Sequence, residues 1–197
     1  MIAVALVAAV IGGTWFALLV ALAAATMFCE WIRIVRGWGL HWLVAGFGYA
    51  LIPALALLWI RERGAHKLDL LLWVFIVTWS TDIGAYFAGR SIGGPKLAPA
   101  ISPNKTWAGL IGGMVAAGLF AGAWVFSLHL PRLLFALAPL FAIGAQAGDL
   151  FESWLKRRAG VKDSGTILPG HGGVLDRLDG LVVVASLTAL AQLAEWL

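Results

Sequence analysis

The side chains that could do chemistry are concentrated in one stretch of this sequence, residues 149–179. The chain has 14 Lys and Arg and 10 Asp and Glu, 24 in all, and ten of these lie within this stretch. Carboxylates stand at both ends of the stretch, and a basic, glycine-rich segment lies between them. Mg²⁺ is commonly held by one or two carboxylates together with substrate phosphates. The pattern therefore indicates a divalent metal that holds a phosphate.

The acidic residues of this stretch fall on helix faces. Asp149, Ser153 and Lys156 are spaced i, i+4 and i+7, which places them on one face. An ordinary interfacial helix end explains the basic residues there, but it does not explain Asp149, which follows a mainly apolar run. Asp176 and Asp179 share a face at the start of the next helix, where the helix dipole alone favours acids. We expect Asp149 and Asp176, from two different helices, to bind the metal.

Two other places carry polar residues outside this stretch. Asp82 lies in an apolar run with Thr78 and Tyr86 four residues away on either side, and an interhelical hydrogen bond would also explain it. Ser102 can cap a helix that has proline at its first position. With Lys105 beside it, this helix start would bind an anion, although capping alone also explains the pattern.

Several classes of site are excluded. His171 stands between glycines and has no second His or Cys at metal spacing, so phosphate contact or loop structure is favoured over zinc. The glycine-rich stretches match neither a P-loop nor a dinucleotide fingerprint. The net charge is +4, but the basic residues lie in short loops, where they set membrane topology, so we expect no nucleic-acid partner.

The elements that must position these residues are membrane helices. The chain is 61% hydrophobic and 12% charged, its mean hydropathy is +0.92, and it has 11 Trp. A span needs about 20 apolar residues, and several runs qualify. The sequence predicts an all-α, polytopic transmembrane bundle of about six or seven helices, one integral membrane domain over 1–197. The helices are expected at 2–12, 14–32, 38–60, 68–89, 106–128, 133–155 and 176–197.

The distribution of positive charge predicts the orientation. If loops 33–37, 90–105 and 156–177 lie on one side, that side holds ten Lys and Arg against four on the other. Cytoplasmic loops are the richer in Lys and Arg, although three positive charges at 61–67 argue weakly the other way. The sequence therefore predicts that the polar site faces the cytoplasm.

The residues of the 149–180 region resemble the signature of the phosphatidate cytidylyltransferases (CDP-diacylglycerol synthases). The spacing is that of the family over residues 153–179. The similarity extends over about 82–180, through Asp82–Arg90 and Lys96–Trp107, with a looser similarity at Glu30-Trp31. The signature is carried by Ser153, Lys156-Arg157, Lys162-Asp163, Pro169-Gly170-His171-Gly172-Gly173 and Asp176-Arg177-Leu178-Asp179.

Two departures from the family pattern lie outside the signature. The family commonly has Glu after its Lys-Thr-Trp, and this chain has Ala108 there. The chain is also short for the family at its N-terminal side.

The resemblance implies that CTP and phosphatidate react, with Mg²⁺, to give CDP-diacylglycerol and diphosphate in phospholipid biosynthesis at a bacterial inner membrane. It implies Asp149 and Asp176 as metal ligands, and Asp149, Asp176, Asp179 and Lys156 as catalytic residues. A second cation and a homodimer are left open. The residues implied in substrate binding are Asp82, Ser102, Lys105, Ser153, Arg157, Lys162, Asp163, His171 and Arg177.

Three alternatives remain at this point. A polyprenol kinase or an archaeal-type CDP-lipid synthase would share a metal and nucleotide site but transfer the γ-phosphate or use another lipid. An ion or phosphate transporter would also place acids within the membrane. Transporters often contain internal repeats, and none is visible in this sequence.

Overall fold

The apolar runs form helices because only a helix or a closed barrel satisfies its backbone hydrogen bonds in lipid. The computed structural model describes residues 2–64, 66–165 and 172–195. The predicted all-α class is confirmed, and each expected helix is present close to its predicted bounds. In chain order the elements are α1 (Ile2–Ile11), α2 (Gly13–Ile34), α3 (Leu40–Glu62), α4 (Lys67–Ser91), β1 (Lys96–Ala98), β2 (Ser102–Thr106), α5 (Trp107–Ser127), α6 (Leu133–Arg158) and α7 (Leu175–Leu193).

Five of the described helices, α2 to α6, are long and apolar enough to cross a membrane. Helix α1 has only 10 residues and is too short. Helix α7 has 19 residues but carries three charged side chains in its first five positions, and it does not qualify. The structure thus supports a polytopic membrane protein, while the predicted count of six or seven spans is not confirmed.

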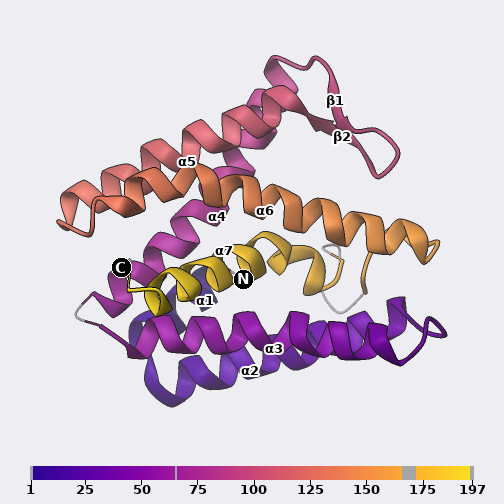
Figure 1. Ribbon diagram of the computed structural model, residues 1–197, viewed down its shortest axis with the longest axis horizontal. Coiled ribbons are helices and arrows are strands. Elements are labelled where there is room, and N and C mark those ends of the chain that lie inside the picture. Colours follow the sequence, from indigo (N-terminus) through magenta and orange to yellow (C-terminus); the bar gives the residue numbers. More distant parts are fainter. Residues whose placement is uncertain (1, 65, 166–171, 196–197) are drawn as a thin grey trace.

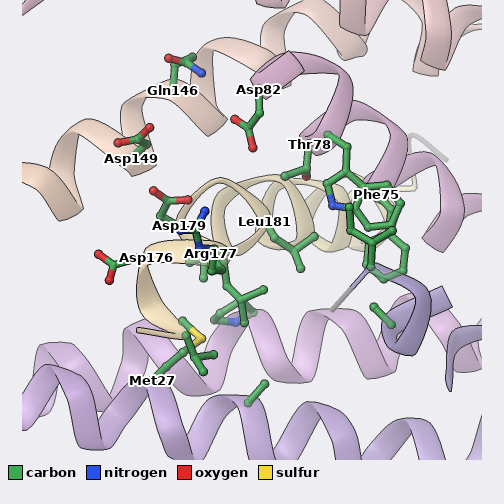
Figure 2. A pocket seen from close by; sticks show the side chains of 18 of the residues that line it. Met27, Phe75, Thr78, Asp82, Gln146, Asp149, Asp176, Arg177, Asp179 and Leu181 are labelled. Carbon is green, nitrogen blue, oxygen red and sulfur yellow. The ribbon is translucent and has the colours of Figure 1, made fainter. Parts of the chain in front are cut away.

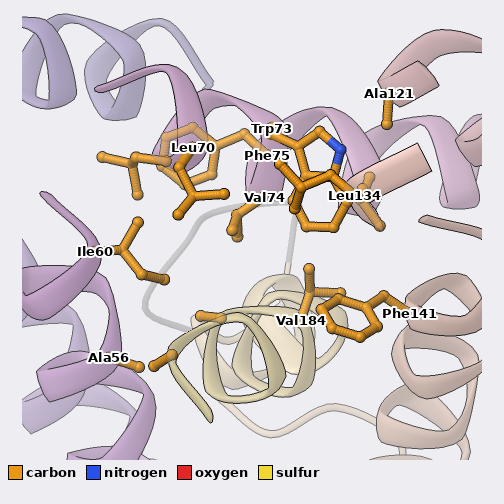
Figure 3. Packing of buried hydrophobic residues seen from close by; sticks show 14 of the residues in the cluster. Ala56, Ile60, Leu70, Trp73, Val74, Phe75, Ala121, Leu134, Phe141 and Val184 are labelled. Carbon is orange, nitrogen blue, oxygen red and sulfur yellow. The ribbon is translucent and has the colours of Figure 1, made fainter. Parts of the chain in front are cut away.

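Helix α7 lies in the middle of the bundle, between the α2–α3 pair and the α5–α6 pair, as Figure 1 shows. It packs against α3, α4 and α6. A buried apolar cluster joins these helices (Figure 3), with Ile60 from α3, Trp73 and Val74 from α4, Phe141 from α6 and Val184 from α7. Contacts with α3, α4 and α6 therefore hold α7 in the bundle, although its charged first turn keeps it out of the candidate spans.

Helices α4 and α5 approach each other closely through small residues. A Cβ atom built at Gly112 would overlap the Cβ of Ala88 and lie 2.9 Å from the Gly84 carbonyl oxygen. A Cβ atom at Gly113 would lie 2.9 Å from the Thr81 carbonyl oxygen. Small side chains let helix backbones meet in this way, and the contact holds α5 and the hairpin before it against α4.

The two strands form a small antiparallel hairpin, with Lys96 opposite Thr106 and Ala98 opposite Ser102. The prediction that Ser102 caps a helix was wrong, because Ser102 lies in β2. The helix begins at Trp107, and Thr106 is its N-cap: the Thr106 Oγ1 accepts a hydrogen bond of 3.0 Å from the Gly109 N–H. Because residues 102–106 pair as a strand, the helix begins four residues later than a cap at Ser102 would place it.

The hairpin, the α2–α3 turn and the end of α6 lie at one end of the bundle, on the right in Figure 1. The turns between α3 and α4 and between α5 and α6 lie at the other end. The described parts of the three segments that the charge distribution assigned to one side therefore lie at the same end of the bundle.

Candidate functional site

A cavity of about 1340 Å³ opens between α2, α4 and α7 and carries two kinds of lining. Its charged end is formed by side chains from α4, β2, α6 and α7, namely Asp82, Lys105, Asp149, Asp176, Arg177 and Asp179. Its apolar wall includes Phe16 and Val20 from α2, Phe75 and Trp79 from α4, and Leu181 from α7. One continuous cavity thus offers both a charged end and an apolar wall (Figure 2).

Asp149 lies on α6 and is held by two neighbours. Its Oδ2 is 2.6 Å from the Lys105 Nζ, and its Oδ1 accepts a hydrogen bond of 3.3 Å from the Ser153 hydroxyl. The Lys105 Nζ also donates to the Gln146 carbonyl oxygen at 3.4 Å. The side chain of Asp149 remains 34% exposed. The predicted placement of Asp149 and Ser153 on one helix face is confirmed.

Asp82, Asp149 and Asp179 surround one space between α4, α6 and α7, as Figure 2 shows. The charges of Asp149 and Asp82 both act on Asp179. The Asp179 Oδ1 accepts a hydrogen bond of 2.7 Å from the Gly180 N–H. Three acids facing one space repel one another, so this space favours a cation.

Lys156 lies behind the cavity wall, between two carboxylates. Its Nζ is 2.5 Å from the Asp176 Oδ1 and 3.3 Å from the Glu152 Oε2. The side chain of Glu152 is only 2% exposed, and its Oε1 has no hydrogen-bond partner among the described residues. A buried charge requires an opposite charge nearby. Lys156 therefore compensates two acids that the bundle has removed from water.

Asp176 stands in the first turn of α7, outside the five candidate spans. Its Oδ2 accepts from the Gly173 N–H at 2.8 Å, the Ser164 N–H at 2.9 Å and the Ser164 hydroxyl at 2.8 Å. Burial raises the pKa of Asp176, but the hydrogen bonds from Lys156, Gly173 and Ser164 outweigh it and lower the pKa to about 2. The carboxylate is therefore ionised at neutral pH.

Other predicted substrate-binding residues lie away from this cavity. Arg157 donates to the Ile101 carbonyl oxygen at 3.4 Å and to the Val161 carbonyl oxygen at 3.2 Å, so it ties the hairpin segment to the loop after α6. Lys162 and Asp163 are exposed on that loop. His171 lies outside the described residues.

Two buried acids that the sequence analysis did not assign, Glu30 and Glu152, lie behind the cavity and contact Ser164 and Lys156, which both bond to Asp176. Glu152, three residues after Asp149, was assigned no role, and Glu30 entered only as part of a looser similarity. Glu30 is the only acidic residue among positions 1–61. An acid in so long an apolar run is costly and marks a candidate functional residue. This was the signal that could have found Glu30.

The donor set of the cavity fits a hard divalent cation that is shared with a ligand. Among the charged side chains that line this part of the cavity, those able to bind a metal are the carboxylates of Asp82, Asp149 and Asp179. Within the described residues, however, no three His, Cys, Asp or Glu side chains are close enough to hold a metal alone. Mg²⁺ sites typically use one or two carboxylates and complete their shell with phosphate and water. The residues therefore fit Mg²⁺ only together with a phosphate ligand.

Comparison with known proteins matches the cytidylyltransferase family over residues 37–193. A phosphatidate cytidylyltransferase of Brucella suis is 50% identical over 168 residues, which cover 81% of this chain and 60% of the relative. The enzyme of that name from Rickettsia typhi is 38% identical over 181 residues, 87% of this chain and 78% of the relative. The chain thus spans about three fifths of the length of the Brucella relative.

Proposed function

This chain belongs to the cytidylyltransferase family, and we propose that it transfers the cytidylyl group of CTP to phosphatidate, giving CDP-diacylglycerol and diphosphate. The observation that carries this proposal is the single cavity with a charged end and an apolar wall. Phosphatidate has an anionic headgroup and two acyl chains, and CTP is a polyanion. A cavity of this kind accommodates the lipid chains and brings both phosphates to the same end.

The chemistry requires little acid–base help. An oxygen of the phosphatidate phosphate forms a bond to the α-phosphorus of CTP, and the bond from that phosphorus to the bridging oxygen of the β-phosphate breaks. The electron pair leaves with diphosphate. Phosphoryl-type transfers of this kind depend on positioning and on neutralising negative charge. The cations and carboxylates at the charged end of the cavity supply both needs.

We assign roles to the residues that face or support this end. Asp149 and Asp176 would hold Mg²⁺, with Asp179 and Asp82 beside it. The bound ion would neutralise charge on the CTP phosphates. Lys105 and Arg177 line the cavity and are assigned to phosphate binding. Lys156 holds Asp176, and Ser153 holds Asp149. Arg157 at the end of α6, Lys162 and His171 are assigned to phosphate contact, and Asp163 supports them.

We further propose a bacterial inner membrane as the location, with the charged end of the cavity facing the cytoplasm, where CTP is available. The grouping of the hairpin, the α2–α3 turn and the end of α6 at one end supports this orientation. So does the excess of Lys and Arg in these segments.

The test is a detergent-micelle assay of the purified protein with CTP, phosphatidate and Mg²⁺. We expect CDP-diacylglycerol and diphosphate in equal amounts. A kinase would release CDP instead, so that outcome would replace the proposal with γ-phosphate transfer. A matched reaction with diacylglycerol in place of phosphatidate should give no product, because the lipid then lacks the attacking phosphate.

A further inference from the structure

Glu30 is a fully buried acid near the end of α2, with a relative exposure of 0%. Within the described part of the chain, its hydrogen-bond partners come from the segment after α6 and from the first residue of α7. The Val174 N–H donates to Oε1 at 3.0 Å, the Leu175 N–H donates to Oε2 at 2.8 Å, and the Ser164 hydroxyl lies 3.1 Å from Oε2. Since a buried charge is stable only when paired or hydrogen-bonded, these contacts account for Glu30 being tolerated there.

Two of these partners are orphan groups of a helix start. The first N–H groups of a helix have no partner within the helix. Val174, the N-cap residue of α7, makes no side-chain capping bond. The carboxylate of Glu30 takes this role from a different helix, and a negative charge at a helix N-terminus is favoured by the helix dipole. Glu30 therefore caps α7 from outside.

The same carboxylate reaches Asp176 through one hydroxyl. The Ser164 Oγ lies 3.1 Å from the Glu30 Oε2 and 2.8 Å from the Asp176 Oδ2. The loop also presses closely on Glu30, because a Cβ atom at Gly165 would lie 2.7 Å from the Glu30 Oε1. A Cβ atom at Gly173 would lie 2.6 Å from its Oε2. Only glycine at these two positions allows the loop to sit this close to Glu30.

Glu30 is itself held by the packing of α2 on α3. The neighbouring Trp31 donates from its indole Nε1 to the Trp42 carbonyl oxygen at 2.7 Å. Its ring occupies the space left by Gly46 of α3, where a Cβ atom would overlap the indole. The packing of α2 on α3 therefore fixes the position from which the Glu30 side chain reaches the loop.

We propose that Glu30 is a positioning residue for the reaction, which fixes Ser164 and the start of α7 so that Asp176 is held at the charged end of the cavity. Glu30 precedes the residues matched by the family, which begin at 37. The role given to Asp176 rests on the proposed function. The contacts of Glu30 with the loop do not, and they can be tested separately.

The principal variant is Glu30→Gln, which keeps the size of the side chain but offers one acceptor oxygen where two are used. Its first measurement is hydrogen exchange of the backbone amides in detergent, without substrate. We expect exchange to be at least about tenfold faster at Val174 and Leu175, and unchanged in α5. The matched control is Glu62→Gln at the exposed end of α3, which should leave every amide at its wild-type rate. Equal acceleration in α5 and α7 would mean a general loss of stability and would overturn the proposal.

The second measurement is turnover of CTP and phosphatidate by the same variants. We expect kcat of Glu30→Gln to fall at least about tenfold, with KM for CTP within about threefold, because geometry rather than binding is disturbed. Turnover by Glu30→Gln within about twofold of the wild type would overturn the positioning role. If the wild type makes no CDP-lipid, the proposed function fails, while the exchange result still decides the contact.

Ser164→Ala provides a second route should Glu30→Gln not fold. It removes the hydroxyl that joins Glu30 to Asp176 and leaves α2 untouched. We expect kcat to fall about three- to tenfold, with faster exchange confined to the start of α7. Wild-type turnover together with wild-type exchange would count against the link through Ser164 and overturn the proposal.

Discussion

At the scale of single residues, Asp149 and Asp176 are held to very different degrees. Each oxygen of Asp149 has one side-chain contact, and the side chain is partly open to the cavity. Asp176 is 11% exposed and accepts from Lys156, Ser164 and Gly173. Asp149 is therefore free to turn toward a ligand, while the position of Asp176 is set in advance.

For the two proposed metal ligands, we expect Asp149→Asn and Asp176→Asn each to lower turnover by at least about a hundredfold, which corresponds to about 2.7 kcal/mol of activation free energy. Asparagine keeps the size of the side chain but loses the charge that the metal needs. The double variant should be little worse than either single one, because residues that act as a unit are not additive. Initial rates over a range of Mg²⁺ concentrations measure this.

The matched control for these variants is Asp69→Asn, in the first turn of α4 at the other end of the bundle. It should keep wild-type turnover. If Asp179→Asn abolishes the Mg²⁺ response while Asp176→Asn keeps it, then Asp179 and not Asp176 is the partner of Asp149.

At the scale of the elements, the α4–α5 contact positions both Asp82 and the hairpin that carries Lys105. We expect Gly112→Ala to destabilise the protein by about 1–3 kcal/mol, because the added methyl group overlaps Ala88 and crowds the Gly84 carbonyl. Thermal unfolding in detergent measures this. The control is Gly118→Ala on the same helix, where a Cβ atom meets nothing within 4 Å. It should be neutral or slightly stabilising, and an equal loss in both variants would contradict the packing argument.

The elements also show which features the sequence could predict. Apolar runs of membrane length identified the helices, because in lipid only a helix or a closed barrel satisfies the backbone hydrogen bonds. The spacing along α6 placed Asp149 and Ser153 on one helix face, because residues four apart in a helix are neighbours, and their hydrogen bond agrees with this placement. The cap of α5 was assigned to Ser102 instead of Thr106, because strand pairing across the hairpin decides where the cap falls. Glu30 was missed because its partners, such as Leu175, lie 145 residues away, and no local pattern encodes a contact of that separation.

At the scale of the whole molecule, the charged end of the cavity and the loops around it should all face the same side of the membrane. In a Cys29→Ala background, we expect Ser91→Cys and Val161→Cys to react with a membrane-impermeant maleimide from the cytoplasmic face, in inverted vesicles. Arg132→Cys, in the turn between α5 and α6, should react from the opposite face. All three positions are exposed. Reaction of positions 91 and 161 from different faces would refute this topology.

The central place of α7 has a consequence for the order in which the chain becomes competent. Ribosomes build proteins from the N-terminus at about 5–20 residues per second, and α7 follows every candidate span in this sequence. The groups at the charged end come from positions as far apart as Asp82 and Asp179. The Glu30 carboxylate binds the start of a helix that is synthesised 145 residues later. A nascent chain that ends after the five candidate spans still lacks Asp176 and Asp179, two of the acids at the charged end. The charged end of the cavity is therefore completed in one late step rather than by degrees.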